Sequence, residues 1–287
     1  DLASEPDLNG NFSASYTVTM RNVGGRSTTY NLTDTPAPDV NITVNGAVVT
    51  NYAALSFTNA GPYTLATGES IAAGATHTYN LTLDLTLGDG ILAGTQLVSE
   101  CVSGDFGFEA NAGLFNQIVT VYGTNNFSVT NTACGEIPPF VVPFKTFVDA
   151  TTPDIDGNFV ATYTITMVNV GGVGTTYNLT DTPDPDPNVI VNGATLSGYA
   201  SDVFTNAGPY TLATGEPIGA GSNHVYTLAV DLTLGDGILA GTQTVSTCAS
   251  DAGGFQANNG LFNEVTLVFG TNDTTITTND CGEIPPY

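Results

Sequence analysis

The stretch Phe12-Ser-Ala-Ser-Tyr-Thr-Val-Thr-Met20 alternates apolar and polar residues without a break. A period of two is typical of a β-strand that turns one face to a core and the other to water. Tyr79-Asn-Leu-Thr-Leu-Asp-Leu85 shows the same alternation. No part of the chain combines a 3.6-residue apolar period with helix caps. The sequence therefore predicts an all-β protein with almost no helix.

The chain consists of two tandem copies of one sequence unit. Asn31-Leu-Thr-Asp-Thr-Pro36 recurs as Asn178-Leu-Thr-Asp-Thr-Pro183, an offset of 147 residues (178 − 31), and the other matched segments share this offset. A duplication this faithful favours a structural array over an enzyme, because each added copy lengthens a fibre or stalk. We expect two domains, the first over residues 1–140 and the second over 141–287.

Short strands separated by turn dipeptides predict an immunoglobulin-like β-sandwich in each copy. Roughly seven to nine strands per copy suit that architecture, and the core must rest on Phe, Tyr, Val and Leu because the chain has no Trp. Asn45-Gly46 and Asp89-Gly90 are among the expected turns. Further strands, each with its copy 147 residues on, are expected near 28–33, 40–44, 47–57, 95–102, 117–123 and 126–133.

A Pro-containing apolar segment joins the two copies, and its counterpart before Asp1 is absent. One interpretation is a chain cut at a repeat boundary. The other is a junction strand that a neighbouring domain or subunit contributes, as in strand-addition fibres. We name as the junction strand Val141, Val142, Pro143, Phe144, Lys145, Thr146 and Phe147.

The composition excludes several classes of partner. The 27 Asp and Glu residues outweigh 3 Lys and Arg, for a formal charge of −24. Phosphate binding needs clustered bases, so neither nucleic acid nor an anionic membrane surface is expected. No apolar run approaches the roughly 18 residues of a membrane span. Because the chain begins with Asp1, we expect a processed or excised piece of a longer product.

The four cysteines are placed alike in the two copies. Four cysteines allow three pairings, and a unit that duplicates must close on itself, so we predict Cys101–Cys134 and Cys248–Cys281. Pairing between copies or between molecules is the less favoured alternative, and two Cys without a nearby His are a weak metal site. Disulfides indicate an oxidising, extracellular or cell-surface location.

Three segments of the second copy resemble a known repeat. Phe144-Lys-Thr-Phe147, Phe159-Val-Ala-Thr-Tyr-Thr-Ile-Thr-Met-Val-Asn-Val-Gly-Gly172 and Tyr177-Asn-Leu-Thr-Asp-Thr-Pro183 are similar to the strands of the repeat called domain of unknown function eleven, and Thr130-Asn-Thr-Ala133 resembles its last strand. That repeat occurs in tandem in bacterial and archaeal surface proteins. The resemblance implies an immunoglobulin-like extracellular module and supplies no catalytic residues.

Acidic loops make calcium the one cofactor that the sequence leaves open. Calcium takes six to eight oxygen ligands from such loops, but EF-hand spacing is missing, and hairpin turns with a solvated acidic surface are the simpler interpretation. The candidate ligands are Asp154, Asp156, Asn158, Asp181, Asp184 and Asp186.

Other single residues carry weaker signals. Lys145 on the first strand could form a covalent cross-link with a last-strand side chain, for which Asn279 and Asp280 are the nearest candidates in the sequence. His77 and His224 are interpreted as packed strand residues. Asn-x-Ser/Thr triplets, which matter only if the producing cell glycosylates them, occur at Asn11, Asn31, Asn41, Asn80, Asn126, Asn178 and Asn272.

The leading hypothesis is a structural component of an extracellular filament, stalk or cell-surface fibre. Its partners would be copies of itself or further repeats of the same polypeptide. The alternative is an adhesin or a calcium- or carbohydrate-binding array, with loop aromatics such as Tyr63, Tyr210, Phe108 and Phe255 as its candidates. No arrangement of acid, base and nucleophile is legible, so an enzyme is not expected.

Overall fold

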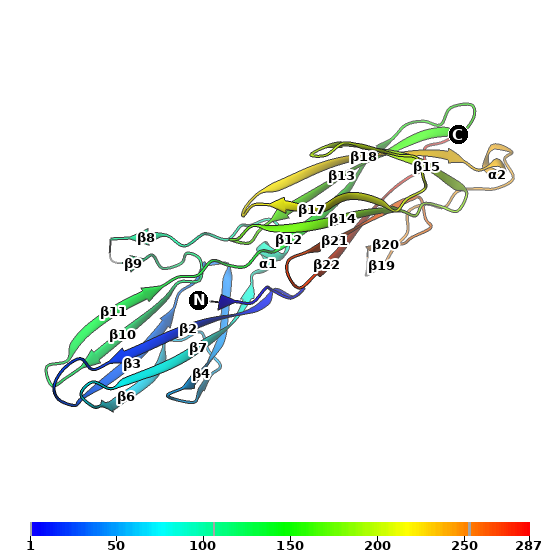
Figure 1. Cartoon of the computed structure of the whole chain (residues 1–287). Helices are drawn as coiled ribbons and strands as arrows, with labels where there is room; N and C mark the ends of the chain where they lie inside the picture. Colours follow the sequence, from blue (N-terminus) through cyan, green and yellow to red (C-terminus); the bar gives the residue numbers. More distant parts are fainter. Residues whose placement is uncertain (1, 106, 252–253) are drawn as a thin grey trace. The chain divides into compact units, whose positions relative to one another are not determined.

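The computed structural model describes residues 2–105, 107–251 and 254–287. These residues are almost entirely β, with two single-turn helices, α1 (Asp89–Leu92) and α2 (Asp236–Leu239). The chain divides into two compact units. Unit 1 is Asp1–Phe140 with Val170–Val173, and unit 2 is Val141–Asn169 with Gly174–Tyr287. All-β architecture is therefore confirmed (Figure 1).

Unit 2 is a sandwich of two antiparallel sheets (Figure 1). One sheet has, in spatial order, β12 (Val141–Ala150), β13 (Asn158–Asn169), β18 (Asn223–Leu234), β15 (Val189–Gly198) and β16 (Asp202–Phe204). The other has β17 (Tyr210–Ile218), β14 (Thr175–Pro183), β21 (Leu261–Phe269) and β22 (Thr274–Gly282). β19 (Ser250–Asp251) and β20 (Gly254–Phe255) form a small antiparallel sheet of two strands.

Unit 1 repeats this topology with one large difference, at its first strand. Its sheets are β1 (Leu2–Ala3), β2 (Asn11–Arg21), β7 (Thr76–Leu87), β4 (Ile42–Asn51), β5 (Leu55–Phe57), and β11 (Phe127–Ala133), β10 (Asn116–Tyr122), β3 (Thr28–Pro36), β6 (Tyr63–Ile71). β8 (Ser103–Gly104) and β9 (Gly107–Phe108) form a small antiparallel sheet of two strands. Where β12 has ten residues, β1 has two.

The alternating segments form the strands that the sequence predicts, because each places one face in the core. In β7 the inward residues Tyr79, Leu81, Leu83 and Leu85 are all buried, while their polar neighbours lie outward. Burial of each such side chain contributes about 1.5–3 kcal/mol. Tyrosine takes the place of the missing tryptophan, since Tyr63, Tyr79, Tyr177, Tyr210 and Tyr226 are among the largest fully buried side chains.

Three expectations about local structure are wrong. Residues 95–102 are not a strand but part of the connection after α1, and β6 and β17 form where no strand was expected. Asn45-Gly46 is not a turn either. It lies inside β4, where the register shifts between Val44 and Gly46, and a Cβ on Gly46 would stand 2.3 Å from the carbonyl oxygen of Phe57. The glycine serves a bulge and a close backbone approach.

Both disulfides expected from the repeat are present, Cys101–Cys134 and Cys248–Cys281, each with Cα atoms 5.9 Å apart. Among the described residues, no helix is long and apolar enough to cross a membrane.

Candidate functional site

In unit 2 the junction strand is the edge strand that closes the sandwich. β12 pairs with β13 from Val141 opposite Asn169 to Phe147 opposite Tyr163. The strand's alternation places Lys145 inward and buried, while Phe144 and Thr146 face outward. β12 also packs against β22 of the opposite sheet, so it bridges the two layers.

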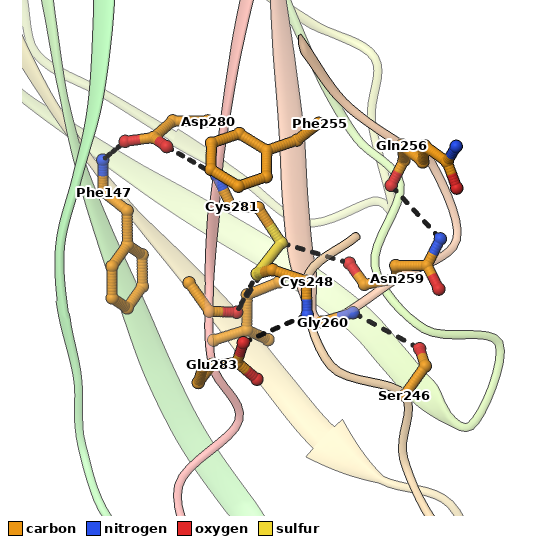
Figure 2. The surroundings of a disulfide bond; sticks show 12 residues. Phe147, Ser246, Cys248, Phe255, Gln256, Asn259, Gly260, Asp280, Cys281 and Glu283 are labelled. Carbon is orange, nitrogen blue, oxygen red and sulfur yellow. Dashed lines mark hydrogen bonds between the residues drawn. A yellow bond between two sulfur atoms is a disulfide. The ribbon is translucent and has the colours of Figure 1, made fainter. Parts of the chain in front are cut away.

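The end of β22 is fixed beside the second disulfide (Figure 2). Asp280 accepts a hydrogen bond of 2.6 Å from the backbone N–H of Phe147 in β12, and its other oxygen accepts one of 2.8 Å from the N–H of Cys281. Gly260 lies against the sulfurs at a φ of +47°, where a Cβ would stand 2.7 Å from Sγ of Cys248. The disulfide therefore holds β22 where it can receive β12.

The ionisable inward side chain of β12 is Lys145. Its Nζ contacts a carboxylate oxygen of Asp181, on β14, and both side chains are fully buried. The ring centroid of Tyr163 lies 4.9 Å from the same Nζ. Burial lowers the pKa of Lys145 although Asp181 raises it, and burial raises the pKa of Asp181 although Lys145 lowers it. Both directions favour an uncharged pair, an amine beside a carboxylic acid.

Asn263 completes this cluster from β21. In the β14–β21 ladder Asp181 is opposite Val265, and Asn263 is opposite Pro183. Asp181 and Asn263 are thus diagonal neighbours on the inward face, and the Asn263 amide acts on the Asp181 carboxyl. Neither polar atom of the fully buried Asn263 side chain has a hydrogen-bond partner of ordinary geometry, and neither has Oδ1 of Asp181.

Unit 1 contains the same cluster without the lysine. Asp34 and Asn116 are buried at the positions equivalent to Asp181 and Asn263, and Nδ2 of Asn116 donates to Oδ1 of Asp34 at 2.8 Å. Oδ2 of Asp34 and Oδ1 of Asn116 are left without partners. Burial raises the pKa of Asp34 to about 7, against the opposing effect of the Asn116 hydrogen bond.

One edge of β2 is paired over only part of its length in the described part of unit 1. β1 pairs only through Leu2 opposite Ser15 and Ala3 opposite Ala14, so in the described part of the chain residues 16–21 have no strand on that side. In unit 2 the equivalent edge of β13 pairs with β12. Exposed edges of this kind are templates for another strand.

A groove runs along this free edge. It consists of two cavities of about 790 Å³ and about 170 Å³ that share Ile118 and Asn131 as lining residues. Its walls come from β2, β10 and β11, and they include Tyr16, Met20 and Val129. We call it the unit 1 groove. It lies where the equivalent surface of unit 2 receives β12.

The groove leaves apolar side chains less covered in unit 1 than in unit 2. Met20 is half-buried, whereas Met167 is fully buried. Tyr122 is 39% exposed, whereas its counterpart Phe269 is 3% exposed. In unit 2, β12 pairs with β13 along the equivalent edge.

The calcium candidates do not come together as one site. Asp154 accepts hydrogen bonds from the N–H groups of Asp156 and Asn158, as a turn residue does. Asp181 contacts Lys145, and Asp186 accepts from Ser246. Among the described residues no group of three or more His, Cys, Asp or Glu could hold a metal ion. Asp184 donates its backbone N–H to Phe262.

Several other candidates lie elsewhere than the sequence suggested. Asn279 accepts a hydrogen bond from the N–H of Phe255, and Asp280 accepts from Phe147, so neither is the direct partner of Lys145. Tyr63 and Tyr210 are buried and cannot form a binding surface. The His77 ring stacks on Tyr52 with centroids 3.8 Å apart, and His224 packs likewise.

The Asn-x-Ser/Thr asparagines lie mostly on the surface. Asn41 is partly buried, and the exposed ones are Asn11, Asn31, Asn80, Asn126, Asn178 and Asn272.

The sequence did contain a signal for the buried cluster. In Tyr177-Asn-Leu-Thr-Asp181 the inward positions are Tyr177, Leu179 and Asp181, so a carboxylate follows two core residues on the same face. Asn263 carries no comparable signal, since its burial depends on the pairing of β21 with β14.

No family model matches the chain, and no curated protein matches it, so the resemblance to the domain of unknown function eleven stays a prediction. Among solved structures, a red sea bream transglutaminase is 10% identical, with 99% of this chain and 30% of that chain covered and a TM-score of 0.25. The B domain of a biofilm associated protein is 11% identical, with 97% and 84% covered and a TM-score of 0.24. The class 5 fimbriae chaperone CfaA is 9% identical, with 98% and 97% covered and a TM-score of 0.20. The chain spans less than a third of the transglutaminase, and likenesses of this size assign neither activity nor partner.

Proposed function

We propose that the chain is a structural, non-enzymatic part of an extracellular or cell-surface fibre, built from tandem disulfide-locked immunoglobulin-like modules that are completed by strand addition. The observation that carries the proposal is the unit 1 groove. Unit 2 supports the proposal, because its own β12 occupies the place equivalent to the groove. The occupant we propose is a strand of the Val141–Phe147 type from a neighbouring module.

The chemistry of the groove supports this occupant. An incoming strand gains main-chain hydrogen bonds along residues 16–21, and specificity comes from alternate side chains. Its inward apolar residues would cover Met20 and Ile118, and its lysine would meet Asp34. The two disulfides are consistent with the oxidising conditions outside the cell. The excess of acidic residues would keep the fibres soluble and make neighbouring fibres repel one another.

Hydrogen exchange of the full chain with a synthetic peptide of residues 141–150 tests the proposal. We expect saturable binding, with new protection confined to the β2 edge of unit 1. The matched control is a peptide with Lys145 and Thr146 exchanged, which keeps the composition but turns the lysine outward. Equal binding of both peptides, or protection elsewhere, would overturn the proposed docking site.

A further inference from the structure

We propose that the Lys–Asp–Asn cluster forms an amide cross-link: Nζ of Lys145 becomes bonded to Cγ of Asn263, with Asp181 transferring the protons and ammonia released. Unit 1 holds the same centre, with Asn116 and Asp34, and lacks only the lysine that an added strand would bring. The part of the proposal that concerns unit 1 rests on the proposed function, because it needs an added strand. The part that concerns unit 2 does not, because unit 2 contains its own lysine.

The placement of the three groups supports the reaction. Lys145 lies on β12, Asp181 on β14 and Asn263 on β21, and all three side chains point into one buried space between the sheets. Rigid strands that hold an amine, an acid and an amide together supply the high effective concentration that an unactivated amide needs.

The lack of ordinary hydrogen bonds at the Asn263 amide also supports the proposed cross-link. A buried amide with neither atom in a hydrogen bond of ordinary geometry costs stability unless something compensates. If Asn263 were only structural, a core apolar residue such as its neighbour Val265 would serve better. An amide that is to be attacked must instead present its carbonyl carbon to the amine.

Burial also favours the protonation states that the reaction needs. An amine attacks only when it is uncharged, and burial favours the neutral form of Lys145. A neutral Asp181 carboxyl can donate to the amide oxygen as the tetrahedral adduct forms. The burial of these side chains strengthens both effects.

The atoms balance without any co-reactant. The Nζ lone pair attacks Cγ of Asn263 while the Asp181 carboxyl protonates the amide oxygen. The resulting Asp181 carboxylate takes a proton from Nζ, and that proton passes to Nδ2. The Cγ–Nδ2 bond then breaks as the carbonyl reforms and returns its proton to Asp181. Ammonia leaves, one C–N bond has replaced another, and Asp181 is again a carboxylic acid.

Intact mass of the reduced and alkylated full chain tests the unit 2 part of the proposal. We expect a mass lower than that of the sequence by one ammonia, and a branched peptide that joins the segments around Lys145 and Asn263. Lys145→Arg and Asn263→Ala should each restore the mass of their own sequence, whereas the matched unit 1 variant Asn116→Ala should keep the loss. The full sequence mass in the unaltered chain, or loss of water through a Lys145–Asp181 bond, would overturn the proposal.

Asp181→Asn separates proton transfer from folding, because it keeps the shape of the side chain. We expect this variant to hold the native hydrogen-exchange pattern of unit 2 yet to release ammonia at least tenfold more slowly after refolding. If it releases ammonia at the parent rate, Asp181 is not the proton-transfer group. If the variant does not fold, Asp181→Glu, which keeps the carboxyl, should retain a measurable rate, and a natively folded Asp181→Glu chain without ammonia loss would overturn the assignment.

The 141–150 peptide tests the unit 1 part of the proposal. We expect an adduct with the mass of chain plus peptide less one ammonia, linked at Asn116 and absent from Asn116→Ala. A peptide with Lys145→Arg should bind without an adduct. If the lysine peptide binds but never couples, the covalent proposal for unit 1 is overturned while the proposed function stands. If neither peptide binds, the proposed function fails, and the unit 2 masses still decide the cross-link there.

Discussion

Units 1 and 2 have the same topology, one equivalent disulfide each and most of their sequence in common. Their sandwiches nevertheless differ in how completely one edge is covered. In unit 2 the ten-residue β12 completes one sheet, contacts β22 and brings a lysine to Asp181. In unit 1, β1 has two residues, a groove borders β2, and Oδ2 of the buried Asp34 carboxyl has no hydrogen-bond partner. The two units of the described chain therefore differ mainly at one edge strand.

The comparison also shows that unit 1 is not merely unit 2 with a strand removed. Asp280, which accepts the N–H of Phe147, is replaced by Ala133 in unit 1. Thr120 stands where unit 2 has Leu267. An added strand would therefore keep the lysine contact in unit 1 but lose one anchoring hydrogen bond.

The largest expected effect comes from removing the lysine of unit 2. Lys145→Met leaves the buried Asp181 carboxyl without its partner and also removes the proposed cross-link, and the unsatisfied buried polar group alone costs about 1–3 kcal/mol. We expect denaturant unfolding to show unit 2 losing at least this much. Arg21→Met, which removes an exposed base from unit 1, should change stability by less than about 0.5 kcal/mol. Equal losses in the two variants would contradict this.

A pH effect should distinguish unit 1. The pKa of Asp34 is raised from 3.8 to about 7 on folding, so its contribution to stability is fully present below 3.8 and is lost as the pH rises through 7. A shift of this size corresponds to about 4 kcal/mol.

Denaturant unfolding between about pH 4 and about pH 8 measures this dependence. Asp34→Asn should abolish most of the unit 1 loss, because its side chain does not ionise. An unchanged pH dependence in that variant would assign the effect to another group.

The disulfides provide a matched pair. Both close a sequence separation of 33 residues, which corresponds to about 3–4 kcal/mol in the chain-entropy description. We expect Cys101→Ala/Cys134→Ala and Cys248→Ala/Cys281→Ala to destabilise their own units by similar amounts, measured by denaturant unfolding. A much smaller loss in unit 1 would show that its open edge already loosens the end of β11.

The smallest expected effect is that of Met20 at the unit 1 groove, which we compare with its buried counterpart Met167 in unit 2. Met167→Ala removes a fully buried side chain, which typically costs about 2–5 kcal/mol. Met20→Ala should cost about 1 kcal/mol or less, because the side chain borders the groove. Saturation with the 141–150 peptide should raise the cost of Met20→Ala, and equal costs without peptide would refute the difference in closure.

The sequence by itself determined the strands whose side chains alternate, the duplication and the pairing of the cysteines. Phe12 to Met20 could form only one kind of half-buried strand, because a period of two places every apolar residue on one face. The repeat settled the disulfide choice, because identical units close on themselves. Local pattern failed at 95–102 and at β6, where neighbouring strands and the connections between them decide the backbone.

Only the tertiary structure decided which side chains meet. Lys145, Asp181 and Asn263 lie on three strands far apart in sequence, and their meeting depends on the order and register of two sheets. The sequence pointed instead to Asn279 and Asp280, because distance along the chain says nothing about depth in a sandwich. The lining of the unit 1 groove was likewise decided by the tertiary structure, because its residues come from strands that are distant in the sequence.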